Sequence, residues 1–263
     1  MHVDQEFANK LAFVMGGGSG IGLAAARLMA ARGAAVAIFS DREDSIEAAR
    51  RIGEETGARA LGFVGDGAQA ADVERAIHAT AAAWGGLDII VNSAAIHPYG
   101  DALSTDEATW DRTLQVNLKS MYLTAHTGIG FMIERGGGAI VNVASNQGSA
   151  CSRNLSAYAT SKGAILAFTR TLAMDFGARG IRANSVSPGP IATPMLQRAA
   201  ELFGDGKTLD ETYRDWGKRV PLQRIGQPEE LAEVVAFLAG PRSSYCTGAD
   251  FVADGGLLAN LGF

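Results

Sequence analysis

The sequence begins its first regular element with Leu11-Ala12-Phe13-Val14-Met15-Gly16-Gly17-Gly18-Ser19-Gly20-Ile21-Gly22. This short apolar run ends in a glycine-rich turn, and residues 23–32 then show an alanine-rich pattern typical of a helix. Glycines let the backbone approach a ligand closely, and the start of a helix offers unpaired N–H groups to a phosphate. Such a turn alone is weak evidence for nucleotide binding. It lacks a Gly-Lys-Ser/Thr ending, which argues against a nucleoside triphosphatase loop.

Apolar runs and helical patterns alternate along the rest of the chain. A second run, residues 35–40, is followed about 20 residues beyond the glycines by Asp41, where a ribose-binding carboxylate belongs in dinucleotide folds. Further strands are expected over residues 59–64, 88–92, 138–144, 181–186 and 249–253, and further helices over residues 44–55, 70–83, 109–134, 156–178 and 227–239. We therefore predict a single-domain, Rossmann-like α/β fold over residues 1–263, a doubly wound parallel sheet of about seven strands with helices on both faces.

The composition narrows the classes of partner and compartment. Hydrophobic residues make up 47% of the chain and charged residues 19%, which is typical of a globular protein. The chain has 23 Lys and Arg against 28 Asp and Glu, a net charge of −5, and no basic run. We therefore expect small-molecule partners and neither nucleic acid nor membrane. The acidic N-terminus does not resemble a signal peptide, which predicts a cytoplasmic protein.

The two cysteines, Cys151 and Cys246, lie far apart in the sequence and have no histidine clustered around them. This spacing supports neither a disulfide framework nor a metal site. We expect both to be inert packing residues.

A second informative stretch is Ser156-Ala157-Tyr158-Ala159-Thr160-Ser161-Lys162, within the expected helix 156–178. Residues at i and i+4 share a helix face, so Tyr158 and Lys162 are able to share one small volume. An ammonium about 4 Å from a phenol, at an effective dielectric of about 20, favours the phenolate by roughly 4 kcal/mol, or about 3 pKa units. The pair thus predicts a tyrosine that exchanges protons near neutrality. The alternative is a half-buried tyrosine beside a solvated lysine.

Taken together, these motifs resemble the short-chain dehydrogenase/reductase family over residues 11–256. Gly16, Gly20 and Gly22 match its Thr-Gly-x-x-x-Gly-x-Gly motif, and residues 92–95 match its Asn-Asn-Ala-Gly motif. The resemblance implies a catalytic tetrad made of Asn117, Ser145, Tyr158 and Lys162. It also implies cofactor contacts from several loops, namely Gly16, Ser19, Gly20, Ile21, Gly22, Asp41, Arg42, Asp66, Gly67, Asn92, Ala94, Tyr158, Lys162, Pro188, Ile191 and Thr193.

By this resemblance the protein is an NAD(P)-dependent oxidoreductase acting on CH–OH donors, which interconverts a secondary alcohol and a ketone by hydride transfer. Tyr158 is then the general acid/base, and Ser145 donates a hydrogen bond to the substrate oxygen. Lys162 is expected to lower the pKa of Tyr158 and to hold the nicotinamide ribose. Asn117 is expected to position a water that connects Lys162 to solvent. These motifs do not specify the substrate.

The end of the second strand bears on the choice of cofactor. Family members that use NAD usually carry a carboxylate at the position of Ser40, whereas those that use NADP often have a small residue there and a base at the position of Asp41. This chain has the small residue without the base. Because a carboxylate at Asp41 repels a 2′-phosphate, we expect NAD(H) in preference to NADP(H). NADP is the alternative, since the Arg42 guanidinium is able to pair with that phosphate.

Three residues depart from the family pattern. Met15 replaces the threonine whose hydroxyl ties the glycine turn to the Asn-Asn-Ala-Gly loop, and Ser93 and Ala95 alter that loop. We expect this tie to be missing or rebuilt, and cofactor binding to survive because backbone groups hold the phosphate. His97, shortly after this loop, either faces the substrate or is solvated.

Two other functions fit parts of the pattern. A catalytically silent dinucleotide-binding sensor or scaffold protein would keep the glycine turn, but the complete tetrad argues against it. Epimerases and dehydratases of nucleotide sugars also use Tyr-x-x-x-Lys, but the chain is short for the C-terminal sugar-binding portion of such relatives.

Two features concern the periphery of the expected sheet. The mixed, polar segment of residues 194–220 predicts a substrate lid of short helices. Small residues in the helix 156–178 and an apolar tail, residues 257–263, favour a homotetramer, as is common in the family. The alternative is a tail folded onto its own subunit.

Overall fold

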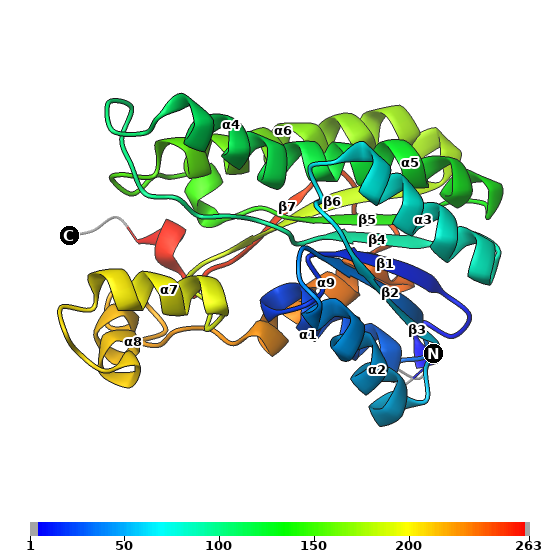
Figure 1. The fold of residues 1–263 in the computed structure, drawn as a ribbon, viewed down its shortest axis with the longest axis horizontal. Coiled ribbons are helices and arrows are strands. Elements are labelled where there is room, and N and C mark those ends of the chain that lie inside the picture. Colours follow the sequence, from blue (N-terminus) through cyan, green and yellow to red (C-terminus); the bar gives the residue numbers. More distant parts are fainter. Residues whose placement is uncertain (1–4, 261–263) are drawn as a thin grey trace.

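The computed structural model describes residues 5–260, and its centre is a seven-stranded sheet (Figure 1). The strands are β1 (Leu11–Met15), β2 (Ala35–Ser40), β3 (Ala60–Val64), β4 (Ile89–Asn92), β5 (Gly138–Val143), β6 (Ile181–Pro188) and β7 (Asp250–Ala253). They lie in the order β3-β2-β1-β4-β5-β6-β7, and every neighbouring pair is parallel. The predicted doubly wound α/β class is confirmed. The order reverses between β1 and β4, so ligands are expected beyond the carboxyl ends of these strands.

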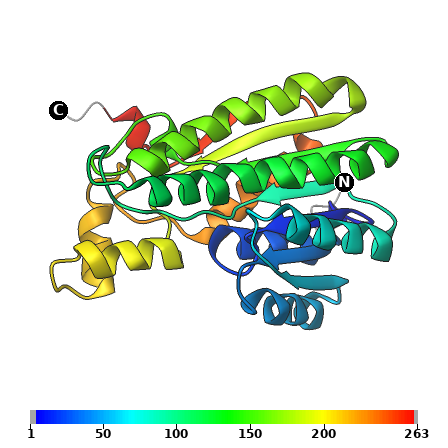
Figure 2. The same ribbon diagram turned by 45° about the horizontal axis from the view of Figure 1, so that its top comes forward.

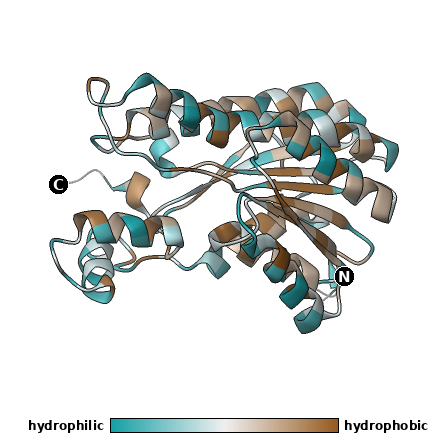
Figure 3. Ribbon diagram, in the orientation of Figure 1, coloured by the Kyte–Doolittle hydropathy of each residue, from teal (hydrophilic) through white to brown (hydrophobic). Residues whose placement is uncertain are grey.

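Helices cover both faces of this sheet (Figures 1 and 2). One face carries α1 (Gly20–Ala31), α2 (Asp44–Thr56) and α9 (Pro228–Ala239), and the other carries α3 (Ala70–Trp84), α5 (Ser120–Glu134) and α6 (Ser156–Phe176). Each face has its own core, because successive side chains of a strand point to opposite faces. Val14 and Ile38 belong to the core under α1 and α9, whereas Phe13 and Phe39 belong to the core under α3 and α5. Figure 3 shows the most hydrophobic residues concentrated in the central strands.

Most expected elements are present, and the differences fall at their ends. The helix after the glycine turn begins at Gly20 and not at Leu23, because the turn itself supplies the first helical carbonyl, from Ser19 to the N–H of Leu23 at 3.2 Å. The single helix predicted over residues 109–134 is divided. It consists of α4 (Glu107–Leu114), a π-helical turn η2 (Gln115–Lys119) and α5.

The segment 194–220 contains two short helices, α7 (Pro194–Phe203) and α8 (Leu209–Gly217). Both begin at threonine caps: Thr193 accepts a hydrogen bond from the N–H of Leu196, and Thr208 forms a capping box with Glu211. In Figure 1 they lie at the left, beyond the main body of the sheet. Between residues 5 and 260, none of the helices combines the length and apolar character needed to cross a lipid bilayer.

Single turns of 3-10 helix lie between these elements: η3 (Asn146–Gly148), η4 (Gly177–Arg179), η5 (Pro241–Ser243) and η6 (Leu257–Ala259). Of the predicted apolar tail, residues 261–263 lie outside the described residues. Cys151 is exposed and Cys246 half-buried, and neither is bonded to another cysteine. The expectation that Cys151 is a packing residue was therefore wrong, since it lies in the loop between η3 and α6.

Candidate active site

The glycine turn packs directly against the loop that follows β4. Gly16 has a φ of +76°, and a Cβ at that position would lie 2.4 Å from the backbone nitrogen of Ala94. A Cβ on Gly22 would lie 2.3 Å from the carbonyl oxygen of Gly16. The N–H of Ser93 donates to the carbonyl oxygen of Met15 at 2.8 Å. The tie between turn and loop is therefore rebuilt through the backbone, which does not need the hydroxyl that Met15 lacks.

The start of α1 presents free backbone donors beside this turn. Ser19 is the N-cap residue, but its side chain makes no capping hydrogen bond, and no acidic residue lies in the first helical turn. A Cβ on Gly20 would lie 3.1 Å from Cγ2 of Thr193, which places the loop after β6 next to the helix start. Ile21 is half-buried beside it. Uncapped N–H groups at a glycine-lined helix start fit the pyrophosphate of a dinucleotide.

At the end of β2 the polar side chains contact one another. Arg42 forms an ion pair with Asp44 at 2.7 Å, and the Ser40 hydroxyl donates to the same carboxylate at 2.8 Å. Asp44 also stands against the glycine turn, because a Cβ on Gly18 would lie 2.4 Å from its Oδ1. Asp41 is exposed. The sequence interpretation did not include Asp44, since nothing distinguishes it from an ordinary acid in the first turn of α2.

At the end of β3, Asp66 is engaged by two neighbours. Its carboxylate forms an ion pair with Arg112 at 2.9 Å and accepts a hydrogen bond from the N–H of Ala68 at 3.0 Å. Burial raises the pKa of this carboxyl, but the hydrogen bonds outweigh it, so the pKa is lowered overall. Gly67 packs against the side chain of Met15, because a Cβ there would lie 3.0 Å from the methionine sulfur. The methionine therefore fills the space next to the loop that follows β3.

Asn92, predicted to contact the cofactor, uses its side chain inside the protein. Its amide donates to Oδ1 of Asn142 at 2.8 Å and its oxygen accepts from Thr124 at 2.7 Å. Asn142 donates in turn to Thr169 of α6 at 2.9 Å. This buried network joins β4 and β5 to α5 and α6. Any contact of Asn92 with a ligand at the sheet edge must therefore come from its backbone.

The predicted catalytic residues meet at the carboxyl end of β5. Ser145 lies two residues beyond the end of β5, while Tyr158 and Lys162 come from the first two turns of α6. All three are buried, and Lys162 is only 2% exposed, which excludes the solvated alternative. The Lys162 ammonium lies 5.5 Å from the centroid of the Tyr158 ring and donates to the carbonyl oxygen of Val143 at 2.9 Å. Pro188 and Ile191, from the end of β6 and its loop, are buried as well.

Burial controls the protonation of this pair. Burial raises the pKa of Tyr158 to about 12, and a hydrogen bond with Ser145 offsets only part of this effect. Burial also lowers the pKa of Lys162 to about 7. The prediction that Lys162 brings the Tyr158 pKa towards neutrality is therefore wrong in this structure. The sequence-based pKa assumed a partly solvated pair. In the structure, burial removes water from both groups, and the lost hydration of the phenolate and of the ammonium decides the two pKa values.

Asn117 lies in the π-helical turn and holds the loop after β4 in place. Its side-chain oxygen accepts from the N–H of Ile96 at 2.8 Å, and its amide donates to the Ile96 carbonyl at 3.0 Å and to the Ser161 hydroxyl at 2.9 Å. Ser161 donates in turn to the carbonyl oxygen of Tyr158 at 2.6 Å. Asn117 thus connects this loop with the turn that carries the tyrosine. Ser161 was missed by the sequence interpretation because its neighbours along the helix gave no separate signal.

The imidazole of His97 lies against Tyr158, with ring centroids 4.1 Å apart and the planes perpendicular. His97 is half-buried against this ring and is therefore not the solvated histidine of the second alternative, while a contact with the substrate stays a prediction. Tyr99 continues this contact, and Phe203 of α7 packs on Tyr99 with centroids 4.6 Å apart. The segment 194–220 thus touches the same loop that Asn117 holds.

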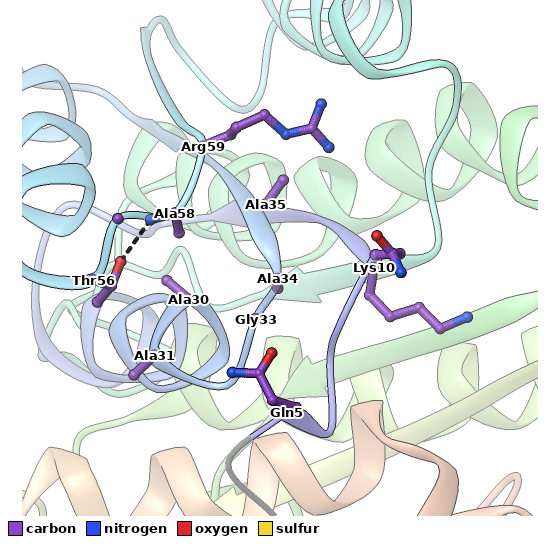
Figure 4. A pocket seen from close by; sticks show the side chains of 12 residues that line it. Gln5, Lys10, Ala30, Ala31, Gly33, Ala34, Ala35, Thr56, Ala58 and Arg59 are labelled. Carbon is purple, nitrogen blue, oxygen red and sulfur yellow. Dashed lines mark hydrogen bonds between the residues drawn. The ribbon is translucent and has the colours of Figure 1, made fainter.

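Two cavities lie away from Ser145, Tyr158 and Lys162. One of about 350 Å³ opens beside the amino ends of β1 and β2, where Lys10, Arg59 and Gln5 line it (Figure 4). Because the predicted catalytic residues lie at the carboxyl ends of the strands, this cavity belongs to the opposite edge of the sheet. Another, of about 190 Å³, is lined by Ile191, Val220 and other residues behind the loop after β6. In the described part of the chain, His, Cys, Asp and Glu side chains form no group of three able to hold a metal ion.

Known proteins resemble this chain over almost its whole length. A family model described as enoyl-(acyl carrier protein) reductase matches residues 16–258. The chain is 39% identical to galactitol 2-dehydrogenase (L-tagatose-forming) of Cereibacter sphaeroides, covering 93% of both proteins. It is 34% identical to cyclohexanol dehydrogenase of an Acinetobacter species, covering 96% of both.

Solved structures agree with these sequence relatives. L-sorbose reductase from Gluconobacter frateurii, complexed with NADPH and L-sorbose, superposes with a TM-score of 0.93 at 30% identity, over 98% of this chain and all of the other. Ligand-free aldohexose dehydrogenase from Thermoplasma acidophilum gives 0.90 at 31% identity, over 98% of each chain. With its glycine turn, its sheet order and its Ser145, Tyr158 and Lys162 cluster, the chain belongs to the short-chain dehydrogenase/reductase family of NAD(P)-dependent oxidoreductases.

Proposed function

We propose that this protein interconverts a secondary alcohol and a ketone, with Tyr158 as the general acid/base. The observation that carries the proposal is the buried cluster of Ser145, Tyr158 and Lys162 at the carboxyl end of β5, on the same edge of the sheet as the glycine turn. When bound, the nicotinamide cofactor supplies or accepts the hydride. The protein supplies the proton and the stabilisation of charge on the substrate oxygen.

Each member of the cluster has a distinct task in this proposal. Tyr158 is protonated at neutral pH because burial raises its pKa to about 12, so it holds the proton that ketone reduction requires. Ser145 donates a hydrogen bond where negative charge develops on the substrate oxygen. Lys162 holds the ribose of the nicotinamide and takes part in proton exchange. Asn117 acts as a positioning residue through its bonds to Ile96 and Ser161.

The cofactor is held in this proposal by the groups that surround the carboxyl edge of β1. The pyrophosphate meets the N–H groups at the start of α1, and the adenosine half extends towards the ends of β2 and β3. The nicotinamide half reaches the loop after β6. The contacts involved are those expected from the sequence, Gly16, Ser19, Gly20, Ile21, Gly22, Asp41, Arg42, Asp66, Gly67, the backbone of Asn92, Ala94, Tyr158, Lys162, Pro188, Ile191 and Thr193.

The proposed roles are tested by two substitutions. Tyr158→Phe removes the proton donor but little of the cofactor's binding, so turnover should be abolished while dinucleotide affinity stays within a few-fold of the parent's. Lys162→Met should lower both turnover and dinucleotide affinity. Turnover is followed by nicotinamide absorbance and affinity by fluorescence titration. Comparable turnover by Tyr158→Phe, on a substrate that the parent accepts, would refute the role of Tyr158.

The substrate is proposed to be a small polyol or a cyclic alcohol, or the matching ketone. This choice is supported by relatives whose names describe activity on galactitol, cyclohexanol and L-sorbose. A panel of such alcohols and ketones, screened with both nicotinamide cofactors, tests it directly. Absence of turnover with every member of the panel would contradict this substrate class.

NAD(H) is proposed as the preferred cofactor, although the sorbose reductase was solved with NADPH. The support is that Arg42 is ion-paired with Asp44, while Asp41 is exposed and forms no ion pair with any residue between 5 and 260. Asp41→Ala should improve the use of NADP without improving that of NAD, since it removes charge repulsion with a 2′-phosphate. A higher kcat/KM with NADP(H) than with NAD(H) in the unmodified protein would assign the ribose contact to Arg42.

We further propose one domain with a substrate lid over residues 194–220, assembled as a homotetramer. The contact of Phe203 with Tyr99 supports the lid. Exposed apolar side chains on α5, α6 and β7 support the assembly: Tyr122 is 48% exposed, Met174 83% and Val252 48%. Light scattering at working concentration tests the assembly, and a monomer would end this part of the proposal. The expected cytoplasmic location stays a prediction.

A further inference from the structure

The loop after β4 brings an imidazole into direct contact with the ring of the proposed acid/base. His97 and Tyr158 are 61 positions apart in the sequence, yet their ring centroids are 4.1 Å apart, with the planes at 90°. Tyr99 contacts the imidazole at 4.8 Å, again edge to face. The ring of His97 is therefore enclosed between two aromatic residues, one of which belongs to the proposed catalytic cluster.

The ring nitrogens of His97 do not contribute hydrogen bonds to the described fold. Its Nδ1 is buried and has no hydrogen-bond partner among residues 5–260, and Nε2 makes no hydrogen bond there either. Nε2 does not belong to the fully buried atoms, so it is the more accessible of the two nitrogens. A buried polar atom without a partner costs about 1–3 kcal/mol. A phenylalanine would make the same ring contacts without that cost.

His97 is uncharged at neutral pH. Burial lowers its pKa to about 4, and the nearby charge of Lys162 acts in the same direction. A neutral imidazole has one nitrogen that donates and one that accepts, so it binds a hydroxyl without placing a charge in the site. Lys162 lies on α6 with Tyr158, and Tyr99 is the other titratable ring in contact with the imidazole.

The segment proposed as a lid contacts this group of rings. Phe203, the last residue of α7, packs edge to face on Tyr99 with centroids 4.6 Å apart. His97 and Tyr99 are both half-buried. A hydrogen bond formed in such a place faces less competition from solvent and discriminates more strongly between substrates.

We propose that His97 is a specificity-determining residue that binds a second hydroxyl of the substrate, on the carbon next to the one that reacts. The inference rests on the proposed alcohol/ketone function. In this proposal one of two oxygens on adjacent carbons meets Tyr158 and Ser145 while the other meets the imidazole, whose ring centroid lies 4.1 Å from that of Tyr158. The substrate class selected is therefore that of vicinal diols and α-hydroxyketones, and simple secondary alcohols lack the group that His97 recognises.

The test compares substrates that differ only in the second hydroxyl. Butane-2,3-diol is paired with butan-2-ol, and cyclohexane-1,2-diol with cyclohexanol. His97→Phe keeps a planar ring but removes both nitrogens, so kcat/KM for the diol should fall about tenfold while that for the simple alcohol stays within about threefold. The loss should appear mainly in KM. His97→Gln, whose amide reaches the position of Nε2, should recover most of the diol activity.

A matched control is available on the surface of α5, where His126 stacks on Tyr122 with centroids 5.4 Å apart. His126→Phe should leave kcat/KM unchanged for both the diol and the simple alcohol. If His97→Phe lowers both members of a pair equally, His97 only supports the Tyr158 ring, and the inference is overturned. It is equally overturned if the parent itself prefers the simple alcohol, a result that requires no variant to fold. Absence of turnover by the parent with any alcohol contradicts the proposed function itself.

Discussion

Replacing Gly16 by alanine tests the packing of the glycine turn against the loop after β4. A Cβ at Gly16 would lie 2.4 Å from the nitrogen of Ala94 and 2.8 Å from the carbonyl carbon of Ser93. Both are backbone atoms, so neither is able to rotate away as a flexible side chain would. The left-handed backbone costs an alanine about 1–2 kcal/mol, and overpacking of this kind costs about 1–3 kcal/mol. Gly16→Ala should therefore lower the free energy of unfolding by about 2–5 kcal/mol.

Gly57→Ala is the matched control. Gly57 has nearly the same backbone angle, a φ of +72°, but a Cβ there would meet no atom within 4 Å. Gly57→Ala should lower the free energy of unfolding only by the cost of a left-handed alanine, about 1–2 kcal/mol. Urea unfolding followed by tryptophan fluorescence measures both variants, and their difference isolates the close approach to Ala94.

The same pair of variants separates stability from cofactor binding. Because the displaced loop lies at the carboxyl edge of β4, Gly16→Ala should weaken NADH binding at least about tenfold, or ~1.4 kcal/mol. Gly57→Ala, at the far end of α2, should leave the affinity unchanged. Equal losses of stability in the two variants, or NADH affinity untouched in Gly16→Ala, would refute the reasoning.

Three further predictions follow from the polar contacts. Burial lowers the pKa of Lys162 from 10.5 to about 7, so between these pH values the unfolded chain binds more protons than the folded protein, and stability rises with pH. Lys162→Met should thus be more stable than the parent at pH 7 and lose this advantage towards pH 10, by up to about 1.4 kcal/mol per pH unit in urea unfolding. Asp44→Ala frees Arg42 from its ion pair. In steady-state kinetics the ratio of kcat/KM for NADP(H) to kcat/KM for NAD(H) should then rise about fivefold, equivalent to ~1 kcal/mol. An unchanged ratio would place Arg42 away from the ribose. Asn117→Ala leaves both backbone groups of Ile96 without their partner and should cost about 2–4 kcal/mol in unfolding, with kcat falling more than KM rises; wild-type kcat would contradict the positioning role.

The sequence by itself determined the layers of the fold and, through the family resemblance, which residues to propose as catalytic. Runs such as residues 11–15 and 35–40 carry no polar alternation, and only strands buried on both faces of a parallel sheet accommodate them. The spacing of Tyr158 and Lys162 is a property of the helix period, so it needed no knowledge of the rest of the chain. Ser145 was assigned only by the resemblance to the family, and the structure places it just beyond the end of β5.

Only the tertiary structure decided how these groups behave. The direction of the Tyr158 pKa depends on how much water the surrounding elements remove, which local spacing does not encode. The contact of His97 with Tyr158 and the bonds of Asn117 to Ile96 join residues that are distant along the chain. The π-helical turn that carries Asn117 was invisible in a continuous helical pattern. Such features arise from the packing of loops against helices, and packing follows from the whole fold and not from any one segment.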